Sequence, residues 1–345
     1  MKNKSRNIQL DIIRDIACFL VIVNHANSRI FTMLTPEAET WWASISRFYL
    51  SKVAVPLFLM LTGYTLLDRE EDFKKSLYRI GRIIMVIIFI SAIYYINDVG
   101  LSGFNIFDYL KAIYKNQTGP SLWYLYTYLG LLVMLSFLMK IGTKISNKQL
   151  AVFLGISFVF FCVYPFVYEE FPEIQYNQLF NVHLFDGFIG YLFLGLFIKK
   201  VKPKIHITFY VIFLVISNIV CVICSHSILV TGGENYLIYD NIFFPAIVIE
   251  AYCVFRILQS IKINEKISKV VCYIAKTTFG IYLISDYLLI KMEPVYQWLC
   301  PKMNDLLAVM IYEIIVYMTG IVIVSVFNLI CKAIKSIIKR IKKSD

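Results

Sequence analysis

The sequence is poor in charged residues and has no long polar segment. Only 17% of its 345 residues are charged, 59% are hydrophobic, and the mean hydropathy is +0.69. Because soluble domains carry roughly 25% charged residues, this composition excludes an ordinary soluble enzyme and predicts a polytopic membrane protein. No polar block is long enough to form a second domain, so we expect one integral membrane domain over residues 1–345.

The sequence also lacks the motifs of several enzyme classes. It has no P-loop, no Rossmann glycine pattern, no Ser/His/Asp order and no clustered His/Cys ligands, so we expect no metal. The eight cysteines are scattered, mostly in apolar runs. Cys221 and Cys224 form a CxxC inside a predicted membrane helix, where a small apolar packing role is favoured over redox or zinc chemistry.

No cleaved signal peptide is expected at the N-terminus. Arg14 and Asp15 interrupt the first apolar run, and no small-residue cleavage site follows it. The first helix should therefore remain in the mature protein.

Apolar runs long enough to cross a bilayer recur along the whole chain. Spanning helices need about 17 to 25 such residues, and the pattern predicts an all-α fold of about ten transmembrane helices. The runs lie near residues 12–31, 48–67, 80–97, 121–139, 150–168, 184–199, 205–225, 241–258, 270–290 and 306–331.

The positions of the basic residues give the predicted orientation. A net charge of +11 could indicate nucleic-acid binding, but most of the 34 Lys and Arg residues lie at the N-terminus, in alternate short loops and in the tail. The intervening loops near residues 169–173 and 234–240 carry acids and no Lys or Arg. This alternation predicts cytoplasmic termini and a bilayer partner, with no nucleic acid. The basic, amphipathic segment 331–345 is expected to lie on the inner leaflet or to be a linker stub.

The first apolar run contains two ionisable residues, Arg14 and His25. They are eleven positions apart, which returns to within about 20° of the same helix face, roughly 16 Å further along the axis. Arg14 could be a snorkelling anchor paired with Asp11, and His25 a core histidine satisfied by a neighbouring helix. Their alignment favours a functional role, because ionisable groups inside a membrane helix are functional candidates.

Other polar features of the sequence allow two interpretations each. The basic residues within 73–82 could hold anionic lipid headgroups, which is the simpler reading, or a phosphorylated ligand. The aromatic residues at 122–125 fit an interfacial belt. Three acids within apolar runs could line a substrate path or neutralise Lys276 or Lys291; these acids are Glu250, Asp286 and Glu313.

Four stretches make the sequence resemble the integral-membrane acyltransferase-3 family of bacterial cell-surface O-acyltransferases. Leu10-Asp-Ile-Ile-Arg14 followed by His25 resembles the opening signature of the family and is the specific motif of the four. The other stretches resemble its second-helix motif, its basic cytoplasmic loop and a late-helix motif; they are residues 55–64, 73–82 and 278–284.

Two positions depart from the family pattern. Thr62 stands where the family usually has serine, and Ser285-Asp286 follows the late-helix motif where the family often continues with histidine. The likeness runs from residue 10 to about residue 290 and agrees with the predicted ten helices.

The resemblance implies a membrane O-acyltransferase of the bacterial inner membrane. A cytoplasmic acyl-coenzyme A, acetyl-coenzyme A in the simplest case, would donate a short acyl group to a hydroxyl of an extracytoplasmic glycan or lipid-linked acceptor. Arginine suits phosphate contacts, and an imidazole suits the general-base step. The implied roles are catalysis for His25 and Arg14, donor binding for Arg14, Arg79 and Arg82, and substrate binding for Tyr64, Trp123 and Asp286.

Two other functions remain open at this point. Similar membrane domains are joined to the serine racemases of glycopeptide resistance, so the chain could transport a small solute such as an amino acid. A racemase-like domain after Asp345 would favour that reading. A lipid-bound scaffold is the third alternative, and coenzyme A would not stabilise it against heat.

Overall fold

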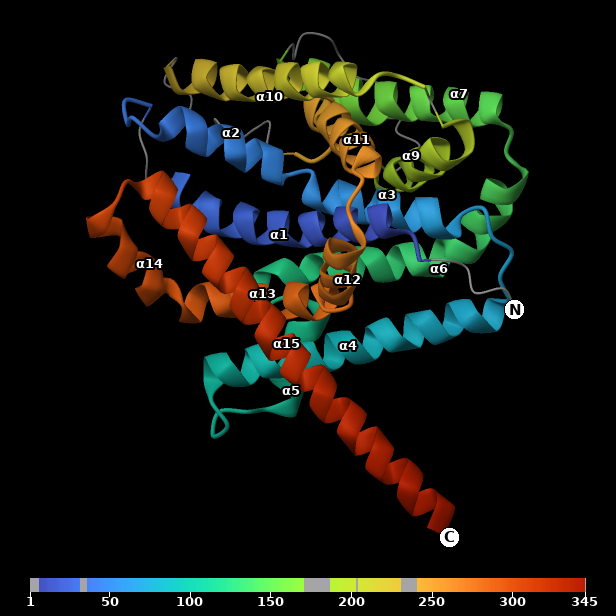
Figure 1. Ribbon diagram of the computed structural model, residues 1–345, viewed down its shortest axis with the longest axis vertical. Coiled ribbons are helices and arrows are strands. Elements are labelled where there is room, and N and C mark those ends of the chain that lie inside the picture. The colour runs from blue at the N-terminus through green and yellow to red at the C-terminus, as the bar shows by residue number, and fades with distance from the viewer. Residues whose placement is uncertain (1–5, 32–35, 171–186, 203, 231–240, 345) are drawn as a thin grey trace. The chain divides into compact units, whose positions relative to one another are not determined.

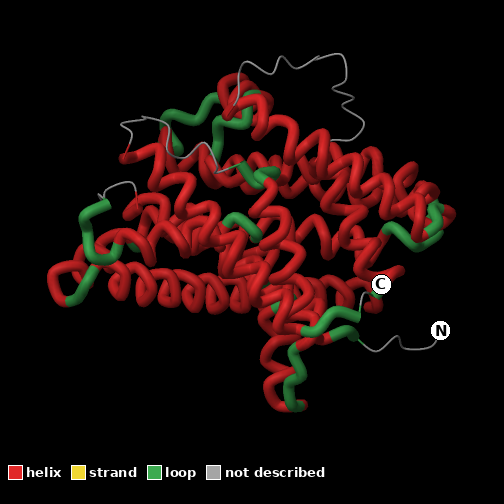
Figure 2. Tube along the Cα trace, turned by 90° about the horizontal axis from the view of Figure 1, so that it is seen from above, coloured by secondary structure: helices red, strands yellow, loops and turns green. Residues whose placement is uncertain are grey.

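Every regular secondary-structure element among the described residues is a helix. The computed structural model describes residues 6–31, 36–170, 187–202, 204–230 and 241–344, and no strand occurs within them (Figure 2). The predicted all-α class is confirmed. The chain divides into two compact units, residues 1–51 together with 261–345, and residues 52–260. One membrane domain over residues 1–345 stays a prediction.

Both ends of the sequence form the first unit. Its central helix is α1, which contacts α2, α12, α13 and α15. The last turns of α15 extend beyond the other helices of this unit (Figure 1). The helices are α1 (Ile8–Phe31), α2 (Trp41–Ser51), α12 (Glu265–Ile274), α13 (Thr278–Lys291), α14 (Glu293–Leu299) and α15 (Asp305–Ser344).

The second unit is continuous in sequence and is built from packed helices. Contacts are densest between α3 and α9 and between α10 and α11. A π-helical turn, Val159–Val163, joins α7 to α8. The helices are α3 (Ala54–Leu66), α4 (Phe73–Val99), α5 (Ile106–Tyr114), α6 (Trp123–Lys144), α7 (Asn147–Phe158), α8 (Tyr164–Glu170), α9 (Gly187–Val201), α10 (Ile207–Val230) and α11 (Pro245–Ser260).

Polar residues placed just before the apolar runs begin several of these helices. The Asp72 side chain accepts a hydrogen bond from the backbone N–H of Lys74 at the start of α4. Ser146 and Gln149 form a capping box at the start of α7. Each cap satisfies backbone N–H groups that have no partner within the helix. The helix boundaries therefore follow from the local sequence.

Two glycines allow α3 and α9 to approach closely. A Cβ atom on Gly63 would lie 1.8 Å from the carbonyl oxygen of Leu192, and one on Gly195 would lie 2.0 Å from that of Met60. Backbone-to-backbone contact through small residues is the usual way in which membrane helices associate. The glycine that interrupts the apolar run at position 63 thus has a packing role.

The described helices indicate a multi-pass membrane protein, with fewer spans than the sequence predicted. Six segments are long and apolar enough to cross a membrane, or seven if α12 and α13, which meet at a 59° bend, form one span. The predicted count of ten is higher because α9 and α11 have only 15 and 16 residues, and α1 carries several charged residues along its length. The six segments are Trp41–Leu66, Phe73–Val99, Trp123–Lys144, Asn147–Val167, Ile207–Val230 and Asp305–Ile337.

Candidate active site

Arg14 and His25 lie on one continuous helix of the first unit. Because α1 runs unbroken from Ile8 to Phe31, their spacing puts both side chains on nearly the same face, roughly 16 Å apart along the axis. The Arg14 side chain is 33% exposed and that of His25 is 28% exposed. Both charged or polar ends are therefore accessible to a ligand.

His25 lies beside the carboxylate of Asp286. The Nδ1 atom of the imidazole is 3.3 Å from Oδ1 of Asp286, across the contact between α1 and α13. Asp286 is almost completely buried, with 5% of its side chain exposed. A buried carboxylate next to one imidazole nitrogen fixes the orientation of the ring and favours a proton on that nitrogen. In that tautomer the lone pair of the imidazole is on Nε2.

A buried carboxylate also organises the other end of α1. Oδ1 of Asp11 accepts a hydrogen bond from Nη1 of Arg14 at 2.5 Å, and Oδ2 accepts one from Nε of Arg6. This hydrogen bond to the Asp11 carboxylate raises the pKa of the Arg6 guanidinium above its ordinary value. Arg6 and Arg14 thus share the Asp11 carboxylate, and Asp15 lies in the same cluster of charges.

The second unit contains the two other predicted donor-binding arginines, Arg79 and Arg82. Arg79 donates to both carboxylate oxygens of Glu71, with an Nη2–Oε1 distance of 2.9 Å. Arg82 is exposed and forms no ion pair with any other residue that the structure describes. Of the two side chains, Arg82 is therefore the more available to an anionic ligand.

Tyr64 lies at the end of α3 among polar side chains of the same unit. The Tyr64 hydroxyl accepts a hydrogen bond from Nε2 of Gln259 at 3.4 Å, and its ring packs against Phe255. The ammonium of Lys199 lies 5.6 Å from the ring centroid and also pairs with Asp68. Tyr64 thus belongs to a polar cluster at one end of the unit, and its role in substrate binding stays a prediction.

Trp123 begins α6 in an aromatic cluster. Its ring contacts those of Tyr124 and Phe188, with centroids 6.1 Å and 6.5 Å away, and 36% of the residue is exposed. These contacts fit an interfacial aromatic position. They leave its predicted role in substrate binding untested.

The two remaining acids of the apolar runs are buried, and the sequence did not identify the residues beside them. Glu313 on α15 pairs with Arg47 on α2, and Glu250 on α11 is fully buried beside Asn218. Lys291, one of the two lysines considered as a partner, lies over the ring of Tyr287. The only sequence signal for Arg47 was a single arginine immediately before an apolar run.

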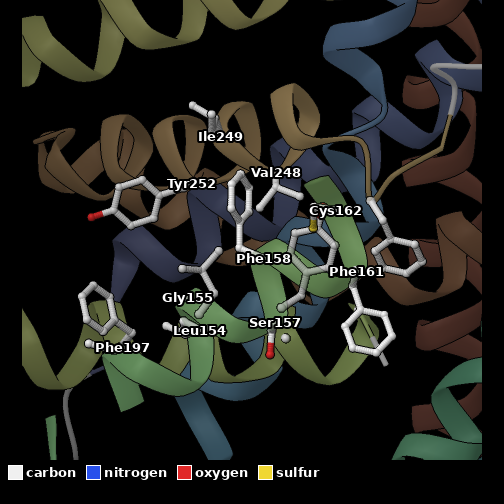
Figure 3. Close-up of a pocket in the computed structure, with 16 residues that line it drawn as sticks. Leu154, Gly155, Ser157, Phe158, Phe161, Cys162, Phe197, Val248, Ile249 and Tyr252 are labelled. Atoms are coloured by element: carbon white, nitrogen blue, oxygen red, sulfur yellow. The ribbon is translucent and has the colours of Figure 1, made fainter. Parts of the chain in front are cut away.

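The second unit encloses an apolar cavity of about 400 Å³. Figure 3 shows the rings of Phe158, Phe161 and Tyr252 facing it, with Gly155 leaving space on α7 and Cys162 contributed by the π-helical turn. None of the described residues that line it is Asp, Glu, His, Lys or Arg. The cavity is suited to hydrocarbon and does not contain the groups that an acid–base reaction needs.

The cysteines and metal-binding side chains form no further site among the described residues. All eight cysteines are free thiols, including Cys221 and Cys224. No group of three or more His, Cys, Asp or Glu side chains in the described ranges is arranged to hold a metal ion. The pair of His25 and Asp286 is therefore the strongest candidate for catalysis.

Comparison with protein families gives one match. A family model described as an acyltransferase domain, that of the acyltransferase-3 family, matches residues 7–330. The match covers residues of both units and every site residue that the sequence predicted. Searches of curated proteins and of solved structures found no match.

Proposed function

The chain belongs to the acyltransferase-3 family and is an acyltransferase, and on that premise we propose that it transfers a short acyl group from cytoplasmic acyl-coenzyme A to an extracytoplasmic hydroxyl. Acetyl-coenzyme A is the proposed donor, and a glycan or lipid-linked sugar is the proposed acceptor. The observation that carries the proposal is the pairing of the partly exposed His25 with the buried Asp286.

In this mechanism Asp286 holds the ring and His25 acts as the general base. A proton on Nδ1 faces the carboxylate, so the lone pair of Nε2 can accept the proton of the acceptor hydroxyl. The Nδ1–Oδ1 distance of 3.3 Å fits a contact that tightens when substrate binds. Asp286, predicted from the sequence to bind substrate, is thereby proposed as a positioning residue for His25.

The transfer step balances without a metal or redox cofactor. The acceptor oxygen loses its proton to Nε2 of His25 and attacks the thioester carbonyl carbon. A carbon–oxygen bond forms and the carbon–sulfur bond breaks, and the coenzyme A thiolate takes the proton back from the imidazolium. One ester and one free thiol leave, and His25 returns to its neutral form.

The cationic end of α1 is the proposed contact for the donor phosphates. Arg14 and Arg6 place two guanidinium groups at this end of the helix, and both are paired with Asp11. A guanidinium makes strong, paired contacts with phosphate oxygens. Because Arg14 and His25 share a helix face, an extended donor lying along α1 would reach from one to the other. A direct catalytic role for Arg14 beyond this contact stays a prediction.

The proposed orientation follows the charge pattern of the loops. We propose cytoplasmic termini, about ten spans that include the short helices α9 and α11, and residence in the bacterial inner membrane. In that orientation Arg14 is at the inner surface and His25 lies past the midplane toward the acceptor. The exposed arginine Arg82 is also assigned to the inner surface.

A transfer assay tests the proposal. The full-length protein in lipid nanodiscs is incubated with radiolabelled acetyl-coenzyme A and surface glycan extracted from the producing cells, and label in the glycan is measured. His25→Ala should abolish incorporation. His206→Ala is the matched control, because His206 is an exposed histidine of the second unit outside the proposed site. Equal incorporation by the two variants would end the catalytic claim for His25.

A further inference from the structure

The ion pair of Arg47 and Glu313 forms the polar base of a second pocket in the first unit. An Nη2 atom of Arg47 lies 2.5 Å from Oε2 of Glu313. The pocket has a volume of about 250 Å³ and is otherwise apolar. Its walls come from α1, α2 and α15; the lining residues are Phe19, Leu20, Val23, Leu50, Met310 and Ile314, together with Arg47 and Glu313.

The pair is incompletely satisfied by the protein. Nη1 of Arg47 and Oε1 of Glu313 are both buried and have no hydrogen-bond partner in the described protein. The Glu313 side chain is 1% exposed. A buried polar group without a partner destabilises the folded protein, and more so when it is charged. One hydrogen-bond donor and one acceptor, on residues already in contact, thus lack protein partners. Both atoms are covered by the surrounding side chains, so a ligand reaches them only after a small rotation of the Arg47 side chain, which is 22% exposed.

This pocket is separate from the His25 site. Phe19, Leu20 and Val23 point between about 120° and 160° away from His25 around the axis of α1. Neither His25 nor Asp286 lines the pocket. A ligand bound here would therefore not be the group that reacts at His25.

Two residues of the pocket wall are exposed and apolar, and they lie on a helix that is apolar enough to cross a membrane. Met310 and Ile314 are 40% and 51% exposed, and both lie on the candidate membrane span of α15. A ligand that enters past them comes from the bilayer, so it must carry an apolar body. The space also exceeds the roughly 30 Å³ of a single water molecule.

The charges at the base select the polar group of the ligand. An anion in the pocket would be attracted by Arg47 and repelled by Glu313. A cation would be attracted by Glu313 and repelled by Arg47, from similar distances. A hydroxyl satisfies both residues, because its oxygen can accept from Nη1 and its proton can be donated to Oε1. A neutral group that is both donor and acceptor fits this site best.

We propose that the pocket between α1, α2 and α15 binds the hydroxyl of a neutral membrane lipid, of which diacylglycerol is the simplest example, against Arg47 and Glu313. The acyl chains lie over the apolar residues of α15. The alternative is an ion pair that only joins α2 to α15. The two differ in whether a hydroxyl-bearing lipid is recognised, and the proposal does not depend on acyl transfer at His25.

A photo-crosslinking experiment tests the proposal. The full-length protein is placed in phosphatidylcholine nanodiscs with a diacylglycerol that carries a diazirine on one chain, irradiated, and digested for mass spectrometry. Unlabelled diacylglycerol and the same lipid with its hydroxyl acetylated serve as competitors. We expect crosslinks in α1, α2 and α15, and about tenfold weaker competition by the acetylated lipid, since it leaves the buried pair without a partner.

Two variants separate recognition from stability. Arg47→Met combined with Glu313→Leu removes the polar base while keeping its volume, and such replacements of a buried pair are often neutral or stabilising. The yield of crosslinked protein should be about tenfold lower in this double variant. The control combines Lys199→Met with Asp68→Leu, which removes an ion pair of the second unit. Crosslinking should be unchanged in this control. Val23→Phe fills the pocket, leaves the pair intact and should also reduce crosslinking, so the proposal stays testable if the double variant fails to fold.

Several outcomes would overturn the proposal. Equal competition by the acetylated lipid would remove the role of the hydroxyl, and a preference for phosphatidylglycerol would remove the requirement for a neutral group. Crosslinks spread evenly over exposed membrane helices would indicate annular lipid only. Unchanged crosslinking in both the double variant and Val23→Phe would assign the ion pair a structural role alone.

Discussion

The imidazole Nδ1 of His25 lies 3.3 Å from the Oδ1 atom of Asp286, across the contact between α1 and α13. The imidazole is partly exposed and the carboxylate is buried, which is the arrangement on which the proposed general-base role of His25 rests. The contact gives Asp286 a role that differs from that of a substrate ligand, and the two roles make different kinetic predictions.

Asp286→Asn should lower kcat for acyl transfer by about 10²–10⁴, with little change in KM for the acyl donor. An amide keeps the size of the side chain but no longer stabilises the imidazolium, and it permits the wrong tautomer of His25. Initial rates at varied acetyl-coenzyme A concentration separate the two constants. Asp286→Glu should recover part of the rate. A rise in donor KM with kcat preserved would instead assign Asp286 to substrate binding.

Arg14→Gln should weaken binding of acetyl-coenzyme A by about tenfold or more, because it removes a charge-assisted contact to phosphate. Isothermal titration of the protein in nanodiscs measures the Kd, and the effect should shrink at high salt. Lys111→Gln is the matched control, since Lys111 is an exposed cation on α5. Equal losses in both variants would indicate a general charge effect and contradict a specific role for Arg14.

Arg82→Gln should reduce donor affinity more than Arg79→Gln does. Arg79 is already held by both oxygens of Glu71, whereas Arg82 is exposed. An arginine that is paired with a carboxylate must break that ion pair before it can bind a phosphate. The net gain in binding free energy is therefore small. The same titration compares the two variants. A larger effect at Arg79 would mean that the Glu71 pair opens when the donor binds.

Gly63→Ala should destabilise the protein by about 3 kcal/mol, through overpacking of α3 against α9. The added Cβ would lie 1.8 Å from a backbone oxygen that cannot move alone. Gly155→Ala is the matched control, because no atom lies within 4 Å of its added Cβ, and it should leave stability unchanged or raise it slightly. Thermal unfolding in detergent provides the measurement. Similar midpoints for the two variants would contradict the close contact at Gly63.

The residues that could be predicted from the sequence are those whose signal is local. The alignment of Arg14 with His25 follows from helical periodicity alone, and the caps at Asp72 and Ser146 are visible as polar residues before apolar runs. The family likeness was carried by the first motif, and the family match over residues 7–330 confirms it. Each of these features needs only neighbours within one helix.

The partners of the buried acids could not be predicted, because they depend on which helices pack together. Asp286 and Glu313 could be recognised as costly in a membrane from the sequence. Hydropathy does not indicate that Asp286 packs beside His25. Nor does it indicate that Glu313 pairs with Arg47. Among the described residues, six or seven of the ten predicted spans have the length and composition of a membrane helix. Apolar runs indicate where helices form, but they do not indicate where a helix bends or how long it is.

The division of the chain has a consequence for its synthesis. The first unit is built from residues 1–51 and 261–345, with the whole second unit between them in sequence. When His25 leaves the ribosome, Asp286 has not yet been made, so α1 must wait in the membrane until α13 follows. A chain interrupted before α13 carries the proposed base without its carboxylate. If the proposed pair is catalytic, acyl transfer requires a polypeptide that has been made at least as far as α13.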